Sequence, residues 1–353
     1  MNVHAPLDAN RATGPLPTGH PMVRSRKVGV LLVNLGTPDG TTYKPMRRYL
    51  KEFLSDKRVI EWPRAAWYPI LYGIVLNTRP TKSGKAYASI WNTERNESPL
   101  RTFTRAQGEK LGLRLAEETQ VVVDWAMRYG KPSIAERTDA LLEAGCDRIL
   151  VYPLYPQYAA STTATVNDAF FQHMLTKRWM PAVRTVPAYH DDPVYIDALA
   201  RSIEKHLSTL DFEPERVVAS YHGIPQSYFR KGDPYHCHCQ KTSRLLEERL
   251  GWPKGRFMTT FQSRFGPEEW LQPYTDKTME ALAKEGVKSV AVLNPGFVSD
   301  CLETLEEIAG EAGEIFLHNG GQKFSHIPCL NDSEEGMDVI EAVVRRELKG
   351  WVG

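Results

Sequence analysis

Two stretches of this chain carry the same short pattern, and each follows an apolar run typical of a buried strand. They are residues 33–38 (Val-Asn-Leu-Gly-Thr-Pro) and residues 220–225 (Ser-Tyr-His-Gly-Ile-Pro). In both, one variable side chain precedes Gly-x-Pro, which is typical of a chain leaving a strand in a turn. The variable residue is Leu35 in the first stretch and His222 in the second. Ligands bind at the carboxyl edge of open α/β sheets, so this pattern places both residues at ligand-binding edges.

Two more pairs of strand ends follow in the same order, which indicates an internal duplication. Strands that begin at Val121 and Phe257 both lead into Arg-aromatic-Gly, and strands that begin at Ile149 and Ser289 both lead to a Pro. Helical segments separate the strands, so each copy should form a parallel sheet with helices on both faces. The predicted fold is therefore α/β, with two similar Rossmann-like lobes and a ligand cleft between them. The predicted crossover helices are 100–118, 134–144, 195–207 and 276–285.

The domain boundaries are predicted from this duplication. Residues 1–26 are rich in Pro, Gly, Thr and Asn, and we expect them to form a mobile tail. The first lobe is predicted to cover 27–200 and the second to cover 201–334. Residues 335–353 begin with an amphipathic segment, which we expect to form a helix that packs back on the lobes.

The first lobe carries an insertion that the second lacks, and residues 62–76 within it are unusually aromatic. This segment holds two Trp and two Tyr among aliphatic residues, and it is interrupted by Pro and Gly. Such a composition suits a lip over an apolar ligand, or a surface that rests on a membrane. An ordinary helical hairpin covering one face of the lobe is an equally good interpretation.

Composition restricts the class of protein. The formal net charge of +1 over 353 residues gives no general attraction to nucleic acid. Five scattered cysteines favour free thiols in a reducing compartment. The N-terminus lacks an apolar segment typical of secretory signals, and no apolar run is long enough to span a bilayer. We therefore expect a cytoplasmic protein, whose lip would allow peripheral contact with the inner face of the membrane.

The nucleotide-binding motifs of doubly wound folds are missing, so other residues must supply the chemistry. No G-x-G-x-x-G follows the first strand, and the chain has no G-x-x-x-x-G-K-[ST]. Glu303, Glu307 and Glu311 are spaced four apart, so they stack along one face of a helix that follows the strand 289–293. A solvated acidic face would explain this row. Apolar neighbours favour partial burial instead, and buried carboxylates require protons, a cation or a water relay.

Residues 235–240 (Tyr-His-Cys-His-Cys-Gln) resemble a metal site by residue type but not by spacing. Ligands so close in sequence cannot converge on one ion unless partners come from elsewhere in the chain. A zinc or iron–sulfur site in this segment is therefore disfavoured.

Taken together, these motifs resemble the protoporphyrin ferrochelatases of bacterial type, which insert ferrous iron into protoporphyrin IX to make protoheme. The resemblance covers residues 28–348. It is carried by residues 32–38, by 152–163 (Tyr-Pro-Leu-Tyr-Pro-Gln-Tyr, then Ser-Thr-Thr), by 220–225, and by 295–305 with its Ser-Asp-Cys-Leu-Glu-Thr-Leu. It implies a lyase with the chelatase-like two-lobed fold, whose substrates are protoporphyrin IX and Fe²⁺.

The resemblance also implies a role for individual residues. His222 matches the essential histidine, which either accepts pyrrole protons or delivers the metal, and Glu303 matches the glutamate that faces it. Both are predicted catalytic residues and metal ligands. Asp300, Glu307 and Glu311 are predicted to form an acidic path leading away from them. The predicted porphyrin-binding residues are Leu35, Arg79, Tyr87, Ser98, Arg128, Tyr129, Tyr155 and Phe297.

Two departures from the family pattern change what we expect. Cys301 stands where the family often has His, which weakens a ligand role for that position. Some members bind a [2Fe-2S] cluster through a Cys at the position of Ala160 and three near the C-terminus. Here no Cys follows Cys329, so the cluster should be absent and no tightly bound cofactor is expected. The long C-terminal tail that helps some members dimerise is also missing, so we expect a monomer.

Two other functions compete with this interpretation. One is a chelatase that inserts cobalt or iron into an earlier, carboxylate-rich tetrapyrrole, against which the aromatic lip argues. The other is a carrier that binds heme or a metal without turnover, which would not need His222 and Glu303 as a pair.

Overall fold

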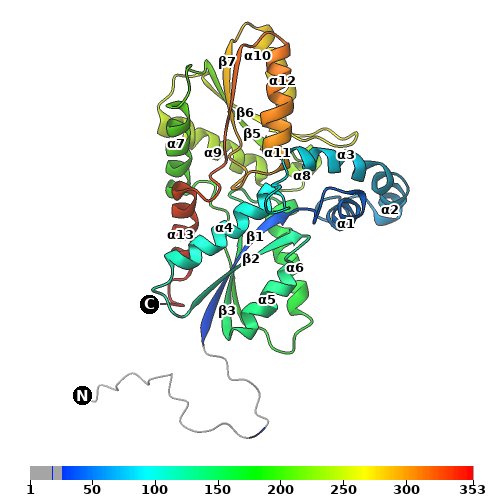
Figure 1. Cartoon of the computed structure of the whole chain (residues 1–353), viewed down its shortest axis with the longest axis vertical. Coiled ribbons are helices and arrows are strands. Elements are labelled where there is room, and N and C mark those ends of the chain that lie inside the picture. The colour runs from blue at the N-terminus through cyan, green and yellow to red at the C-terminus, as the bar shows by residue number, and fades with distance from the viewer. Residues whose placement is uncertain (1–17, 19–25, 353) are drawn as a thin grey trace, which may run out of the picture.

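Two four-stranded parallel sheets with the same strand order form the framework of the protein (Figure 1). This computed structural model describes residue 18 and residues 26–352, so the predicted N-terminal tail lies almost wholly outside the described residues. The orders are β2-β1-β3-β4 and β6-β5-β7-β8, which confirms the duplicated α/β fold. The strands are β1 (Lys27–Gly36), β2 (Val121–Tyr129), β3 (Cys146–Pro153), β4 (Ala182–Thr185), β5 (Arg216–His222), β6 (Phe257–Gln262), β7 (Ser289–Leu293) and β8 (Lys323–Ile327).

The helices connect and cover these strands. The four predicted crossover helices are present as α4, α5, α7 and α10, with ends that differ from the expected ones by a few residues. Three segments are π-helical and are labelled η. The α-helices are α1 (Tyr43–Leu54), α2 (Arg64–Ile70), α3 (Leu76–Ser89), α4 (Pro99–Arg114), α5 (Ile134–Glu143), α6 (Thr165–Met174), α7 (Pro193–Leu207), α8 (Gln226–Arg230), α9 (Tyr235–Leu250), α10 (Thr275–Lys284), α11 (Leu302–Thr304), α12 (Gly313–His318) and α13 (Glu334–Glu347), and the π-helices are η1 (Leu71–Val75), η2 (Ala160–Ala164) and η3 (Leu305–Ala312).

One hydrophobic core runs through both lobes on the side of α7 and α13. It joins Leu150 of β3 and Ala219 of β5 to Ile203 of α7 and Val343 of α13. The domain boundary expected at residue 200 therefore falls inside α7, which is a continuous helix shared by this core. The other face of each sheet has its own smaller core, covered by α5 and α6 in the first lobe and by α10 and α12 in the second.

The insertion in the first lobe forms a helical projection, seen at the right of Figure 1 as α1, α2 and α3. The predicted lip is α2 followed by η1, and Pro69 lies inside α2. Trp67 and Leu71 of the lip are buried against α1 and α3 in a fourth core. Leu302 of the second lobe packs against the same core, so the projection closes over the boundary between the lobes.

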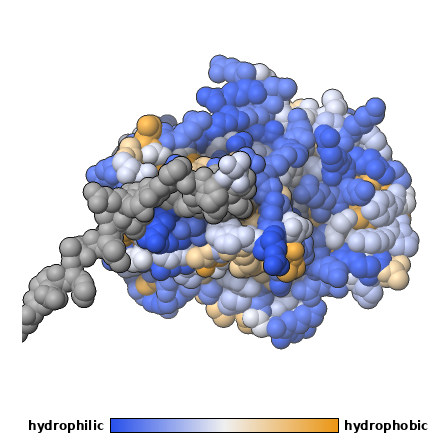
Figure 2. All heavy atoms as spheres, turned by 90° about the horizontal axis from the view of Figure 1, so that it is seen from below, coloured by the Kyte–Doolittle hydropathy of each residue, from blue (hydrophilic) through white to orange (hydrophobic). Residues whose placement is uncertain are grey.

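Both sheets direct their carboxyl ends toward the middle of the molecule (Figure 1). β1 rises from below and ends at Gly36, while the chain after β7 descends to α11. Gly36 has a φ of +112°, and a Cβ there would lie 1.8 Å from the Tyr129 carbonyl oxygen of the neighbouring strand. Only glycine fits this close approach. The opposite end of the first lobe, viewed in Figure 2, is mostly hydrophilic with small separate apolar areas. Within the described residues, we find no helix with the length and apolar character needed to cross a membrane.

Candidate active site

His222 is the last residue of β5, and its ring is held in one tautomer. Its Nδ1 lies 2.6 Å from the carbonyl oxygen of Gly223. A carbonyl oxygen only accepts hydrogen bonds, so Nδ1 carries the proton and donates it. In the neutral ring Nε2 therefore keeps a free lone pair, which can accept a proton or bind a metal ion.

The acidic helix begins beside this strand end and is mostly π-helical. Cys301 caps it, since its backbone N–H donates to Thr304 Oγ1 at 3.0 Å and its sulfur accepts from the first turn. Glu303 lies in the short α11, and η3 carries Glu307 and Glu311. π-helical segments are rare and concentrate at functional sites.

Glu307 is anchored between the acidic helix and the end of β6. Ser263 donates to its carboxylate through the backbone N–H at 2.8 Å and through its hydroxyl, and Gln262 Nε2 donates at 3.3 Å. Burial raises the pKa of Glu307, and the negative charge of Glu303 raises it further. The bonds from Ser263 and a positive charge on His222 act in the opposite direction. Glu307 thus lies within electrostatic reach of both His222 and Glu303.

The acidic residues run from the interior to the surface. Glu303 and Glu307 are half-buried, whereas Glu311 is exposed. Glu306 belongs to the same row. Burial raises its pKa, and the charges of Glu311 and Glu307 raise it further. Partial burial of this row is therefore correct, and a fully solvated acidic face is excluded.

A group of buried tyrosines lies near the acidic helix. Tyr87 and Tyr49 belong to the core under the lip, on which Leu35 packs. Burial raises the pKa of Tyr49 and of Tyr87 well above the ordinary value, and the charge of Glu303 adds to both shifts. Tyr155 has a buried hydroxyl with no hydrogen-bond partner. The structure thus brings Leu35 and Tyr87 together in one core, with Glu303 within electrostatic reach of Tyr87. Tyr155 lies within electrostatic reach of Tyr49 in the same core.

Comparison with known proteins now decides the family. The sequence matches the ferrochelatase family over residues 27–348. It is 74% identical over 337 residues to the ferrochelatase of Agrobacterium fabrum (strain C58 / ATCC 33970), covering 96% of this chain and 98% of that protein. It is 72% identical over 346 residues to the ferrochelatase of Rhizobium meliloti (strain 1021), covering 98% of this chain and 100% of that protein. The chain belongs to the ferrochelatase family. Membership makes the protein a lyase of the metal-chelatase class.

Solved structures show the same fold at low sequence identity. SirB from Bacillus subtilis with Fe³⁺ matches with a TM-score of 0.55 at 13% identity, covering 91% of this chain and 95% of SirB. The sirohydrochlorin chelatase SirB from Bacillus subtilis subspecies spizizenii in complex with cobalt matches with a TM-score of 0.51 at 12% identity, covering 92% of this chain and 99% of that one. This likeness confirms the two-lobed chelatase fold. The fold alone does not distinguish a ferrochelatase from a chelatase for a carboxylate-rich tetrapyrrole. The match to the ferrochelatase family favours the former.

Arg128 and Tyr129, both predicted to bind porphyrin, are tied to a residue that the sequence did not single out. Arg128 forms an ion pair with Asp56, and its Nε donates to the Thr165 carbonyl oxygen at 2.8 Å. The Tyr129 hydroxyl donates to the same Asp56 carboxylate at 2.9 Å, and the Arg128 guanidinium stacks on the Tyr129 ring at 4.3 Å. These contacts fix both side chains within electrostatic reach of Tyr155. Burial raises the pKa of Tyr155, Tyr129 raises it further, and the charge of Arg128 acts in the opposite direction.

Asp300, which the sequence predicts to belong to the acidic path, makes a set of hydrogen bonds of its own. It is buried, and its carboxylate accepts hydrogen bonds from Asn331 Nδ2 at 2.6 Å and from Thr304 Oγ1 at 2.9 Å. The backbone N–H of Cys329 also donates to it, at 3.4 Å. Asp300 therefore anchors the start of the acidic helix to the 329–331 turn, which is a structural role.

Three other predicted porphyrin-binding residues lie in different surroundings. Arg79 is exposed on α3 and stacks on Phe265 of the second lobe at 4.7 Å. Ser98 is buried and caps α4, accepting from the Arg101 backbone N–H at 3.3 Å. Phe297 is not packed on the core under the lip and borders a small cavity against α7.

Gln262 and Ser263 are the site residues that the sequence interpretation missed. They follow the predicted strand 257–261 directly, as polar residues at the carboxyl edge of a sheet, which was the signal available. Gln262 is buried, and its Nε2 also donates to the Glu303 carbonyl oxygen at 2.7 Å. Tyr49 gave no such signal, because it lies on α1, within the insertion that the duplication does not describe.

The Cys- and His-containing segment at 235–240 forms the first turns of α9. Cys239 is fully buried while Cys237 is exposed, so the two side chains point in different directions. Within residues 26–352 no group of three or more His, Cys, Asp or Glu side chains is arranged to hold a metal ion. A polar surface hollow of about 340 Å³ lies at the amino end of β5 and β6, lined by residues 213–216 and 253–256. It is separated from His222 by the whole length of β5.

Proposed function

We propose that this protein inserts ferrous iron into protoporphyrin IX to form protoheme, with His222 and Glu303 at the reacting centre. The observation that carries the proposal is the free Nε2 lone pair of His222, which lies within electrostatic reach of Glu307. Glu303 is in turn within electrostatic reach of Glu307 and of the tyrosines in the core under the lip. The names of the relatives, ferrochelatases at 74% and 72% identity, support the substrate.

The chemistry requires proton acceptors close to the metal. A free porphyrin carries two pyrrole N–H protons, and both leave as the divalent ion binds the four nitrogens. The lone pair of His222 can accept one proton, and a half-buried carboxylate whose pKa is raised, such as Glu307, is a better base than an exposed one. The same lone pair could deliver the metal instead, because neutral imidazole is a good ligand for divalent iron.

The acidic path then connects the reacting centre with solvent. Four carboxylates are close enough for their charges to shift the pKa of Glu306 or of Glu307: these are Glu303, Glu306, Glu307 and the exposed Glu311. We propose that a cation or protons move along this row. Asp300 is left out because its oxygens are occupied by Asn331, Thr304 and Cys329.

The walls of the cleft would hold and bend the porphyrin ring. Leu35 and Tyr87, with Tyr155, offer an apolar surface on one side, and binding at the periphery can supply strain that tilts a pyrrole nitrogen toward the metal. Arg79 is exposed on α3 beside Phe265 of the second lobe, and we propose that it meets a propionate. Ser98 is buried at the start of α4 and its hydroxyl caps that helix, so a direct propionate contact from its side chain is not part of the proposal.

We further propose a monomer without a bound iron–sulfur cluster, with peripheral membrane contact through the lip. Tyr68 and Tyr72 of the lip are 38% and 40% exposed, and Ile74 is 60% exposed, which suits contact with an apolar surface.

The test compares substrates. Under anaerobic conditions, purified protein is mixed with Fe²⁺ and either protoporphyrin IX or a carboxylate-rich tetrapyrrole, and loss of free-porphyrin fluorescence is followed. Turnover of protoporphyrin IX above the protein-free rate is expected. Turnover of the carboxylate-rich ring alone would favour the rival chelatase, and tight binding without turnover of either would favour a carrier.

A further inference from the structure

The helical projection around the lip has a strong net positive charge within a nearly neutral protein. Residues 43–89 contain ten Lys and Arg but three Asp and Glu, a formal net charge of +7, although the whole chain carries +1. The other residues therefore carry −6 together. From residue 62 to residue 89 there is no acidic residue at all. Such local asymmetry marks a surface for an anionic partner.

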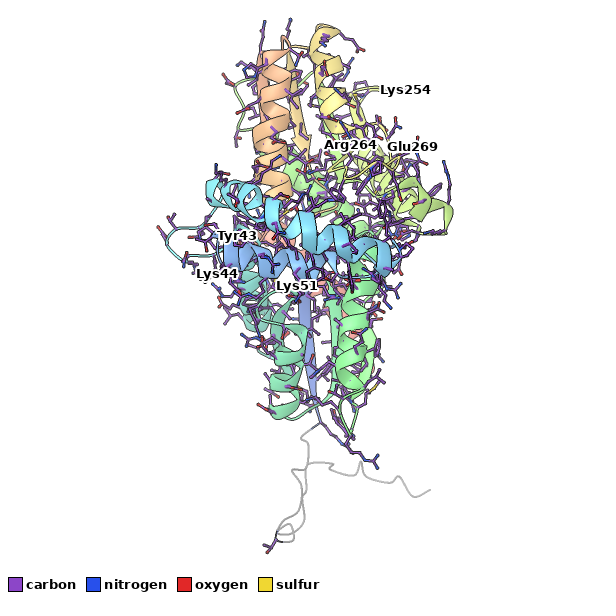
Figure 3. All side chains as sticks on the ribbon, turned by 90° about the vertical axis from the view of Figure 1, so that its right-hand side faces the viewer. Tyr43, Lys44, Lys51, Lys254, Arg264 and Glu269 are labelled. Atoms are coloured by element: carbon purple, nitrogen blue, oxygen red, sulfur yellow. The ribbon has the colours of Figure 1, made fainter. Side chains whose placement is uncertain are left out.

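Much of this charge is exposed and unpaired. Lys44 and Lys51 lie on α1, and Lys82 and Lys85 lie on α3, which packs beside α1. All four are exposed, and within the described part of the chain no carboxylate lies within ion-pair distance of any of them. We call these four lysines the basic surface. Figure 3 shows Lys44 and Lys51, with the neighbouring Tyr43, on the projection that faces the viewer.

An apolar tip lies beside the basic surface. Exposed Tyr68, Tyr72 and Ile74 lie on the lip, and a side-chain atom added at Gly73 would meet open space. The Lys51 ammonium lies 5.8 Å from the centre of the Tyr72 ring, which places a cation directly beside the tip. Tyrosines next to lysines are typical of segments at the boundary between lipid headgroups and acyl chains.

We propose that the basic surface binds the headgroups of anionic phospholipids while the lip inserts its apolar tip between them. This inference rests on the proposed membrane contact of the lip and specifies its lipid class. An acidic protein partner would pair with the lysines equally well, but it would not explain why Tyr72 and Ile74 are exposed at the tip. A bilayer with anionic headgroups accounts for both the charge and the apolar tip.

The position of this surface connects it to the site. Arg79 on the same helix as Lys82 stacks on Phe265 of the second lobe, which packs against the core under the lip. The charge of Lys82 acts on Glu306 of the acidic helix. A bilayer bound here would lie next to the cleft, and an apolar porphyrin could pass between the bilayer and the cleft without crossing bulk water.

The test measures binding of the full chain to vesicles of phosphatidylcholine alone and to vesicles that also contain phosphatidylglycerol. We expect stronger binding to the anionic vesicles at about 0.1 M salt, and loss of this preference at about 1 M, where the Debye length falls to about 3 Å. Replacing Lys44, Lys51 and Lys85 together by Gln should weaken anionic binding about 100-fold, because each cation near the surface contributes about fivefold.

Controls separate charge from apolar insertion. Lys254→Gln removes an exposed lysine of the second lobe, also labelled in Figure 3, and should leave vesicle binding unchanged. Ile74→Ser should weaken binding to anionic vesicles without changing its salt dependence. Equal binding to both kinds of vesicle, absence of binding, or wild-type binding by the triple variant would overturn the proposal.

Metal insertion with detergent-dispersed protoporphyrin IX is measured on the same samples, so the two proposals fail separately. Unchanged insertion together with lost vesicle binding supports a membrane role for the three lysines. A higher KM for porphyrin with unchanged vesicle binding would assign the lysines to the carboxylates of the substrate instead, and it would overturn the lipid proposal. Wild-type protein without insertion activity would overturn the proposed function but not the lipid preference.

Discussion

Gln262 connects the strand that carries His222 to the acidic helix, so replacing it should affect both stability and turnover. Its amide makes four hydrogen bonds in a buried position. Oε1 accepts from Ser220 Oγ at 2.7 Å and from Asn294 Nδ2 at 2.8 Å, while Nε2 donates to the Glu303 carbonyl oxygen at 2.7 Å and to Glu307 at 3.3 Å. Gln262→Met keeps the length and most of the volume of the side chain but removes all four bonds.

The expected loss of stability can be worked out from these bonds. At about 1 kcal/mol for each buried hydrogen bond, the variant should lose about 4 kcal/mol of unfolding free energy. The midpoint of thermal unfolding should then fall by about 5 °C. Turnover should fall about 10- to 100-fold, as is typical when a partner that orients a metal-site side chain is lost.

Urea unfolding followed by circular dichroism measures the first effect, and anaerobic metal insertion measures the second. Gln240→Met makes the same chemical change on the exposed face of α9 and should alter stability by less than about 0.5 kcal/mol. If Gln262→Met were as stable and as active as Gln240→Met, the reasoning that Gln262 holds the acidic helix in place would be wrong.

Three further outcomes follow from the structure. Gly36→Ala forces a Cβ to 1.8 Å from the Tyr129 carbonyl oxygen, so it should lower the free energy of unfolding by about 3 kcal/mol. Gly112→Ala is the control, because its Cβ would have its nearest contact at 3.9 Å, and it should be neutral or stabilising in denaturant titrations. His190 stacks on His238 at 3.7 Å beside Asp191 and Lys241, and burial followed by the charge of His238 lowers its pKa from 6.5 to about 4. Between pH 6.5 and 4 the unfolded chain therefore binds a proton that the folded chain does not bind, so stability should fall as the pH drops through this range. His190→Gln should make the midpoint of thermal unfolding less dependent on pH. Ala160 has no thiol at the position where the family resemblance would place a cluster ligand, so the purified protein should lack the visible absorption of an iron–sulfur cluster. Such absorption after anaerobic purification would refute the expectation.

Strand ends were the most informative part of the sequence. Six of the eight strands lie within the predicted runs or extend them, because central strands of parallel sheets are continuous apolar segments. The missed strands, β4 and β8, are short edge strands with mostly half-buried residues, and their composition resembles that of loops. The helix α9 was not predicted, because the Cys- and His-containing segment in its first turns was interpreted as a metal-binding pattern and not as the start of a helix.

The site was predictable to the extent that residue type and spacing determine position. The row of glutamates could be placed on one helix face by spacing, and apolar neighbours indicated partial burial. Asp300 shares that helix start, but its hydrogen bonds come from Asn331 and Cys329, which are distant in sequence. The π-helical path of η3 and the bonds of Ser263 to Glu307 also depend on tertiary contacts, so no local pattern could indicate them.

The most direct test of the account is a single-turnover measurement of Fe²⁺ insertion into protoporphyrin IX already bound to the protein. We compare the wild type with His222→Ala and with His318→Ala, which removes an exposed histidine at the end of α12. The account predicts that His222→Ala binds porphyrin normally but fails to insert iron, while His318→Ala behaves as the wild type. Normal insertion by His222→Ala would contradict the central claim that His222 acts at the reacting centre.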